Sequence, residues 1–157
     1  MPKRFKFRLE AVLKHRKQVE DEKAGALGRA VLMRQEAEAA LQAVLDAQTD
    51  LNRKRAELQH SGRFTAMDLE EHVRYLSALQ AKEVERRRHL ERQRQAEEAA
   101  RQELVLARQE REVLDRLREN QHLEYLKELD AADAKLIDEL ATQAHARKIL
   151  GIERSGT

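Results

Sequence analysis

Between Phe5 and Gln59 the apolar residues recur at alternating steps of three and four. Two heptad positions carry an apolar residue at twelve of fifteen sites. The first position comprises Leu9, Arg16, Lys23, Ala30, Ala37, Val44, Leu51 and Leu58, and the second comprises Val12, Val19, Ala26, Met33, Ala40, Ala47 and Lys54. Leu13, Leu27 and Leu41 widen this apolar stripe on one side. Such a repeat predicts a helix that supercoils with a partner helix.

Glycine and proline divide the chain into few segments. Residues 65–150 contain neither, and the preceding break is the segment His60-Ser61-Gly62-Arg63-Phe64. We therefore predict a single coiled-coil domain over 1–157, with a helix at about 5–60, a turn at 61–64, a helix at 65–150 and a tail at 151–157. Gly62 suits the left-handed conformation that ends a helix, and Thr65 with Asp68 predicts a cap on the second helix.

The second helix is expected to be longer than its partner. At 1.5 Å per residue the helices span roughly 80 Å and 130 Å. With a turn near residue 62, residue i faces about 124 − i, so residues after Gln121 form a C-terminal overhang. Its apolar side chains need a partner because an isolated helix is marginal in water. The expected fold is all-α, a long two-helix antiparallel coiled coil with a helical overhang that docks into another protein.

The apolar stripe of the second helix is less regular than that of the first. Leu69, Val73, Leu76 and Leu79 predict a seam beside the turn. Tyr75 is read either as part of this seam or, with Leu79, as an exposed anchor pair.

Composition and charge restrict the function further. The chain has 157 residues, 38% of them charged and 3% aromatic, with a formal net charge of +2 and no cysteine. Near-balanced charge disfavours a dedicated nucleic-acid binder. No uncharged apolar stretch approaches the ~18 residues of a membrane span, so we expect a soluble, cytoplasmic protein.

No catalytic or metal-binding pattern is found. The six histidines lack the i, i+4 spacing of a helical zinc site, and we expect them to be solvated residues of the helix surface. We therefore expect neither an enzyme nor a cofactor. The basic first seventeen residues, from Lys3 to Lys17, are read either as a solvated face that complements the opposing helix or as a surface that docks on an acidic protein rim.

Both ends of the chain resemble the flagellar FliJ family. The opening Phe5-Lys6-Phe7-Arg8-Leu9-Glu10-Ala11-Val12-Leu13 with Arg16 is similar to the family's F-x-F-R-L-E-x-V-L-x-x-R motif. The block Glu124-Tyr125-Leu126, the run from Asp133 to Ala141 and Arg147 resemble its C-terminal block, although Ala134 stands where the family often has Gln.

The resemblance implies a stalk of the flagellar type III export apparatus, similar to the gamma subunit of rotary ATPases. The implied partners are the hexameric export ATPase, the cytoplasmic domain of the export gate and export chaperones, for a monomeric hairpin at the inner membrane of the flagellar base. The implied ATPase-facing residues are Arg8, Arg16, Asp138, Glu139 and Arg147. The gate-facing candidates near the turn are Val44, Leu51, Tyr75 and Leu79.

Two alternatives remain open at this point. One is the equivalent stalk of a virulence-type injectisome, which shares the architecture and the class of partner. The other is a generic coiled-coil scaffold that forms homodimers.

Overall fold

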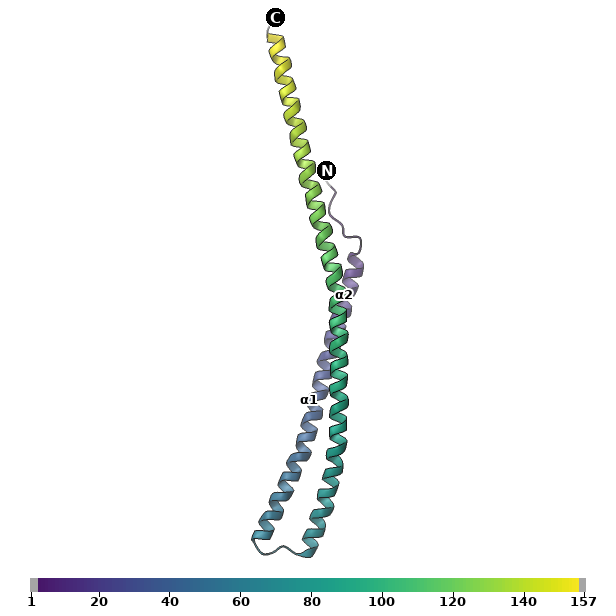
Figure 1. Ribbon diagram of the computed structural model, residues 1–157, viewed down its shortest axis with the longest axis vertical. Coiled ribbons are helices and arrows are strands. Elements are labelled where there is room, and N and C mark those ends of the chain that lie inside the picture. The colour runs from purple at the N-terminus through teal and green to yellow at the C-terminus, as the bar shows by residue number, and fades with distance from the viewer. Residues whose placement is uncertain (1–2, 156–157) are drawn as a thin grey trace. The chain divides into compact units, whose positions relative to one another are not determined.

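The computed structural model describes the backbone of residues 3–155 and the side chains of residues 3–151. Within this range the chain forms two α-helices and no strand (Figure 1). Helix α1 spans Glu10–His60 and helix α2 spans Ala66–Ser155. The two helices pack against each other as a hairpin, which confirms the predicted all-α fold.

Both outer helix boundaries differ from those expected. Helix α1 begins at Glu10 rather than at about residue 5, because residues 3–7 have no regular secondary structure and residues 8–9 form a turn, in which the Glu10 amide donates to the Phe7 carbonyl at 3.2 Å. The segment Phe5-Lys6-Phe7-Arg8-Leu9 alternates apolar and basic residues, and its apolar residues are buried or half-buried while its basic residues are exposed. At the other end, α2 continues through Gly151 to Ser155, where the sequence predicted a tail. Residues 156 and 157 of that predicted tail lie outside the described range.

The turn contains the local structure that the sequence predicts. Gly62 has a φ of 72°, the left-handed conformation that glycine adopts without strain. The Asp68 amide donates to the Thr65 hydroxyl at 3.1 Å, and the Thr65 amide donates to the Asp68 carboxylate at 3.0 Å. These two bonds form a capping box that satisfies free amides at the start of α2. The bond from the Thr65 amide to the Asp68 carboxylate favours the charged form and, with a smaller contribution from the Thr65 hydroxyl, lowers the pKa of Asp68.

The chain divides into two compact units, and both helices run through both of them. The terminal unit comprises Met1–Lys17 with Gln109–Thr157, and the turn unit comprises Gln18–Arg108. Whether 1–157 behaves as a single domain stays a prediction.

The seam of α1 differs by one residue from the predicted second heptad position. Leu13 and Leu41 are buried, with 1% and 8% of their surface exposed, whereas Val12 and Met33 are 41% and 51% exposed. The inner position is therefore the series Leu13, Glu20, Leu27, Arg34, Leu41, Gln48 and Arg55, all of it buried or half-buried. The predicted position beginning at Val12 was therefore wrong at Val12 and Met33, whereas Val19, Ala26, Ala40 and Ala47 are half-buried, as it requires.

The pairing of the helices is also shifted from the simple reflection about residue 62. Lys23 pairs with Glu103 rather than facing residue 101, and Gln48 donates to Glu83 rather than facing residue 76. The midpoint between His60 and Ala66 is residue 63, which accounts for the offset of two residues at Lys23 but not for the offset of seven at Gln48. The free part of α2 therefore begins after about Leu129, not after Gln121. Every described residue from Asp130 to Gly151 is exposed.

Candidate protein-binding surfaces

The N-terminal segment of the terminal unit, residues 3–9, is held on α2 by aromatic contacts. The Phe5 ring lies 4.8 Å from His122 and 5.6 Å from Tyr125, measured between ring centroids. The Tyr125 hydroxyl donates to the Lys3 carbonyl at 2.6 Å. Phe7 is buried, with 7% of its surface exposed. This segment is therefore an ordered strap on α2.

The outer face of this segment and of the first turns of α1 is basic. Each of its cations is exposed and forms no ion pair with any described residue: Lys3, Arg4, Lys6, Arg8, Lys14 and Lys17. Arg16 differs from them, because it is half-buried and pairs with Glu110. Of the two arginines predicted to face an ATPase, Arg8 is thus free for a partner, whereas Arg16 holds the helices together.

The free part of α2 carries the other three predicted ATPase-facing residues. Asp138, Glu139 and Arg147 are exposed, and their side chains pair with no described residue. At 100° per residue, Arg147 lies on the same face of α2 as Leu136 and Leu140, whereas Asp138 lies on the opposite face. Leu136 and Leu140 are 55% and 56% exposed. The three residues therefore surround the helix and do not form one cluster.

The predicted gate-facing residues near the turn separate into two groups. Val44 and Leu79 lie in the seam, with 9% and 4% of their surface exposed, and Leu51 is half-buried. Tyr75 is 53% exposed and faces solvent. Direct contact with a partner is therefore open to Tyr75, while Val44 and Leu79 are placed to hold α1 and α2 together.

Exposed apolar residues that the sequence placed in the seam also lie beside the turn. Leu69 and Val73 are 44% and 56% exposed, so their assignment to a closed seam was wrong. Leu58, at the last site of the first heptad position, is 39% exposed. Their heptad spacing gave no sign of this exposure, because periodicity does not report how far apart two helices lie.

His72 contradicts the expectation that all six histidines are solvated. It is buried, with 6% of its surface exposed, and its Nε2 has no hydrogen-bond partner among the described residues. A buried polar atom left unpaired costs about 1–3 kcal/mol. His72 is therefore a weak point of the seam beside the turn.

Other kinds of site find no support in the described part of the chain. No three His, Cys, Asp or Glu side chains gather there in an arrangement that could hold a metal ion. Neither helix contains, over the described residues, a stretch that is long and apolar enough to cross a bilayer.

The fold places the chain in the class of helical hairpins built from two long α-helices. The family model described as flagellar FliJ protein matches residues 5–149. The chain therefore belongs to the FliJ family, a family of non-catalytic stalk components of the flagellar export apparatus. No curated protein and no solved structure gave a match to the chain.

Proposed function

We propose that this protein is a stalk that binds the hexameric flagellar export ATPase with its paired termini and promotes the assembly and activity of the ring. The observation that carries the proposal is the free part of α2, in which every residue from Asp130 to Leu150 is exposed. A helix with an exposed apolar face and no partner is marginal in water, and insertion into a socket would stabilise it.

The residues proposed for ATPase contact come from both termini of the hairpin. Arg8 on the strap and Asp138, Glu139 and Arg147 on α2 are exposed and available to a ring that surrounds them. Arg16 is proposed to act indirectly, because its pairing with Glu110 fixes the start of α1 on α2. A socket that encloses α2 on all sides agrees with charged residues on its opposite faces.

The turn end is proposed to bind the cytoplasmic domain of the export gate. Tyr75 is its main anchor, and the exposed apolar residues Leu58, Leu69 and Val73 lie on the same part of the hairpin. Large aromatic side chains are frequent hot spots of protein interfaces. The protein would thus work in the cytoplasm, at the inner membrane of the flagellar base, as a monomeric hairpin that also escorts export chaperones.

The ATPase contact is tested by changing the apolar face of the free helix. Replacing Leu136 and Leu140 by serine should abolish stimulation of the purified ATPase ring, because burial of these two leucines is lost. The matched control replaces Ala134 and Ala141 by serine on the opposite face. Equal stimulation by both variants and by the unchanged protein would refute ATPase docking through this face.

The gate contact is tested by comparing Tyr75→Ala with Leu79→Ala. Tyr75→Ala should weaken binding to the cytoplasmic domain of the gate and leave the melting temperature nearly unchanged, because Tyr75 is exposed. Leu79→Ala should lower the melting temperature, because Leu79 is buried. If Tyr75→Ala binds the gate domain with unchanged affinity, Tyr75 is not an anchor.

A further inference from the structure

The inner positions of both helices alternate between leucine and a polar residue every seven residues. In α1 the series is Leu13, Glu20, Leu27, Arg34, Leu41 and Gln48, and the alternation ends there because the next inner residue, Arg55, is polar. In α2 the series is Leu76, Glu83, Leu90, Glu97, Leu104 and Arg111. All twelve residues are buried or half-buried. Each series therefore repeats every fourteen residues, twice the heptad.

In the central layers of the turn unit, leucine of α1 lies opposite leucine of α2, and polar residues lie opposite polar residues. Leu41 packs with Leu90 and Ala37 in a buried cluster. Leucines recur fourteen residues before Leu41 and on both sides of Leu90, whereas Arg55 stands fourteen residues after Leu41, and the layers on either side of the cluster are polar. Arg34 Nε donates to the Glu97 carboxylate, and the Gln48 amide donates to Glu83 at 3.5 Å.

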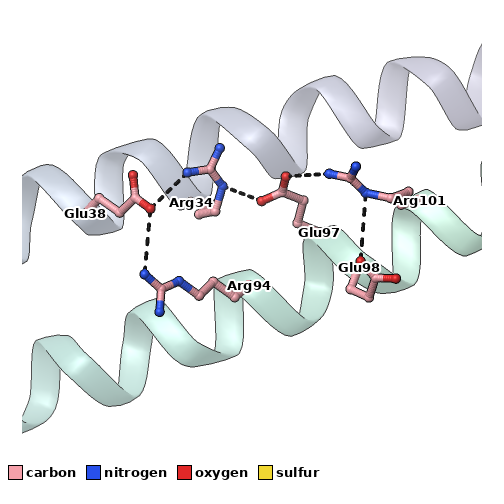
Figure 2. Close-up of polar contacts among 6 residues, drawn as sticks. All are labelled: Arg34, Glu38, Arg94, Glu97, Glu98 and Arg101. Atoms are coloured by element: carbon pink, nitrogen blue, oxygen red, sulfur yellow. Dashed lines mark hydrogen bonds and ion pairs between the residues drawn. The ribbon is translucent and has the colours of Figure 1, made fainter.

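The central polar layer is a network and not an isolated pair. Figure 2 shows Arg34 of α1 reaching Glu97 of α2, while Glu38 of α1 lies between Arg34 and Arg94. Glu97 also accepts from Arg101 at 3.1 Å. The side chains of Arg34 and Glu97 are 24% and 11% exposed, so this layer is partly removed from water. Its bonds to two carboxylates raise the pKa of Arg34, which keeps the guanidinium charged.

We propose that this fourteen-residue alternation selects a single register for α1 on α2. The reason is that a slip of α1 along α2 would place different side chains opposite each other in the seam. A slip by one heptad in either direction would place Arg34 opposite Leu90 or Leu104, because these leucines lie seven residues on either side of Glu97. Arg34 would then keep only Glu38 of its own helix and Glu97 only Arg101, so each partly buried charge would lose its partner across the seam and face leucine instead, which is unfavourable.

A slip by two heptads restores the matching of leucine with leucine, but the charges then oppose it. In one direction Arg34 would face Arg111. In the other direction, Glu20, which pairs with Arg108 at 3.5 Å, would face Glu97, although Arg34 would then face Glu83. Like charges facing each other in a seam are repulsive. Charge repulsion therefore opposes both slips that the leucine spacing alone would allow, and in the second direction the attraction between Arg34 and Glu83 offsets part of it.

An ordinary heptad seam of alanine and leucine does not specify register so strictly. Buried polar residues at single seam positions are known to fix register at some cost in stability. In this chain the polar layers of the seam bear this cost in stability. They hold α1 and α2 at one axial position relative to each other within the turn unit.

The register can be measured by the distance between two spin labels. The chain has no cysteine, so Ala24→Cys and Ala81→Cys, both exposed and in the turn unit, accept labels at two defined sites. These sites are far apart along the hairpin, and a one-heptad slip would change their axial separation by about 10 Å. The labelled protein should give one distance by double electron–electron resonance.

The decisive variant replaces the six polar members of the two series by leucine: Glu20, Arg34, Gln48, Glu83, Glu97 and Arg111. We expect it to remain helical but to give additional distances separated by about 10 Å, or to associate into larger species in sedimentation. A single distance at the unchanged value, in a monomer, would overturn the proposal, because leucine packing alone would then fix the register.

A second pair of variants covers the case in which the leucine variant does not fold. The half-inverted variant carries Arg34→Glu and Glu38→Arg on α1, which places like charges across the seam. The fully inverted variant adds Arg94→Glu, Glu97→Arg, Glu98→Arg and Arg101→Glu on α2. The half inversion should lower the melting temperature and broaden the distance, and the full inversion should restore both. Failure of the full inversion to restore them would mean that charge matching does not select the register.

Discussion

Leu13→Ala is expected to destabilise the hairpin more than any neighbouring truncation in the first turns of α1. Leu13 is 1% exposed and is the largest fully buried side chain among the described residues. Truncating a buried leucine to alanine costs about 2–5 kcal/mol in globular cores. A two-helix seam can relax toward solvent, so we expect the lower part of that range, about 2–3 kcal/mol.

This loss corresponds to a readily measured change in melting temperature. For a chain of this size, 1 kcal/mol shifts the melting temperature by about 2–4 °C, so we expect a decrease of about 4–12 °C. The matched control is Val12→Ala, because Val12 is adjacent but 41% exposed. It removes only partly buried methyl groups, and alanine has the higher helix propensity, so its cost should stay below about 1 kcal/mol.

The assay is urea unfolding followed by circular dichroism at 222 nm, at one fixed protein concentration. Leu13→Ala should lower the midpoint and leave the slope unchanged, which indicates a change in stability and not in the extent of unfolding. The reasoning is refuted if Val12→Ala costs as much as Leu13→Ala. Such a result would place Val12 in the seam, as the heptad pattern alone predicts, and would contradict the observed register.

Three further predictions concern single polar groups. Because the pKa of Asp68 is lowered in the folded state, its cap stabilises the start of α2 at pH values above the ordinary aspartate pKa, and this stabilisation is lost as the pH falls through the lower folded pKa. In the unchanged protein, amide protection at the start of α2 should therefore fall on acidification, and Asp68→Asn should not show this part of the loss. His72→Leu should raise the free energy of unfolding by about 1 kcal/mol, because it removes the unpaired Nε2 from the seam, and an unchanged or lower urea midpoint would show that His72 has a partner in solution. Tyr125→Phe should speed amide exchange in residues 3–9 and leave α1 unaffected, because it removes only the hydrogen bond to the Lys3 carbonyl. Unchanged exchange would show that the aromatic contacts alone hold the strap.

The sequence was sufficient for the features that depend on local chemistry. The long segments without glycine or proline predicted both helices, and Gly62, Thr65 and Asp68 predicted the turn and its cap. The excess length of the second helix predicted a free C-terminal part. These features depend on backbone conformation and on residues a few positions apart, which a single sequence displays directly.

Features that depend on where α2 lies relative to α1 were harder to predict from the sequence. Val12 and Leu13 are adjacent apolar residues, and only the position of α2 decides which of them is buried. The burial of Val44 and Leu79, which the sequence offered as partner contacts, depends in the same way on how closely the helices approach. The strap was read as helix because no glycine or proline separates it from α1, and its contacts with His122 and Tyr125 lie more than a hundred residues away.

The separation in sequence of the paired residues also bears on the order in which the hairpin folds. Gln48 and Glu83 are 35 residues apart, Arg34 and Glu97 are 63 apart, and Lys3 and Tyr125 are 122 apart. Loop-closure entropy increases with separation, so contacts beside the turn form at the lowest entropic cost, and each pair that forms shortens the loop that the next must close. The chain is thus expected to zip from the turn toward its termini, and during synthesis the N-terminal strap has no binding surface until the ribosome has released Tyr125.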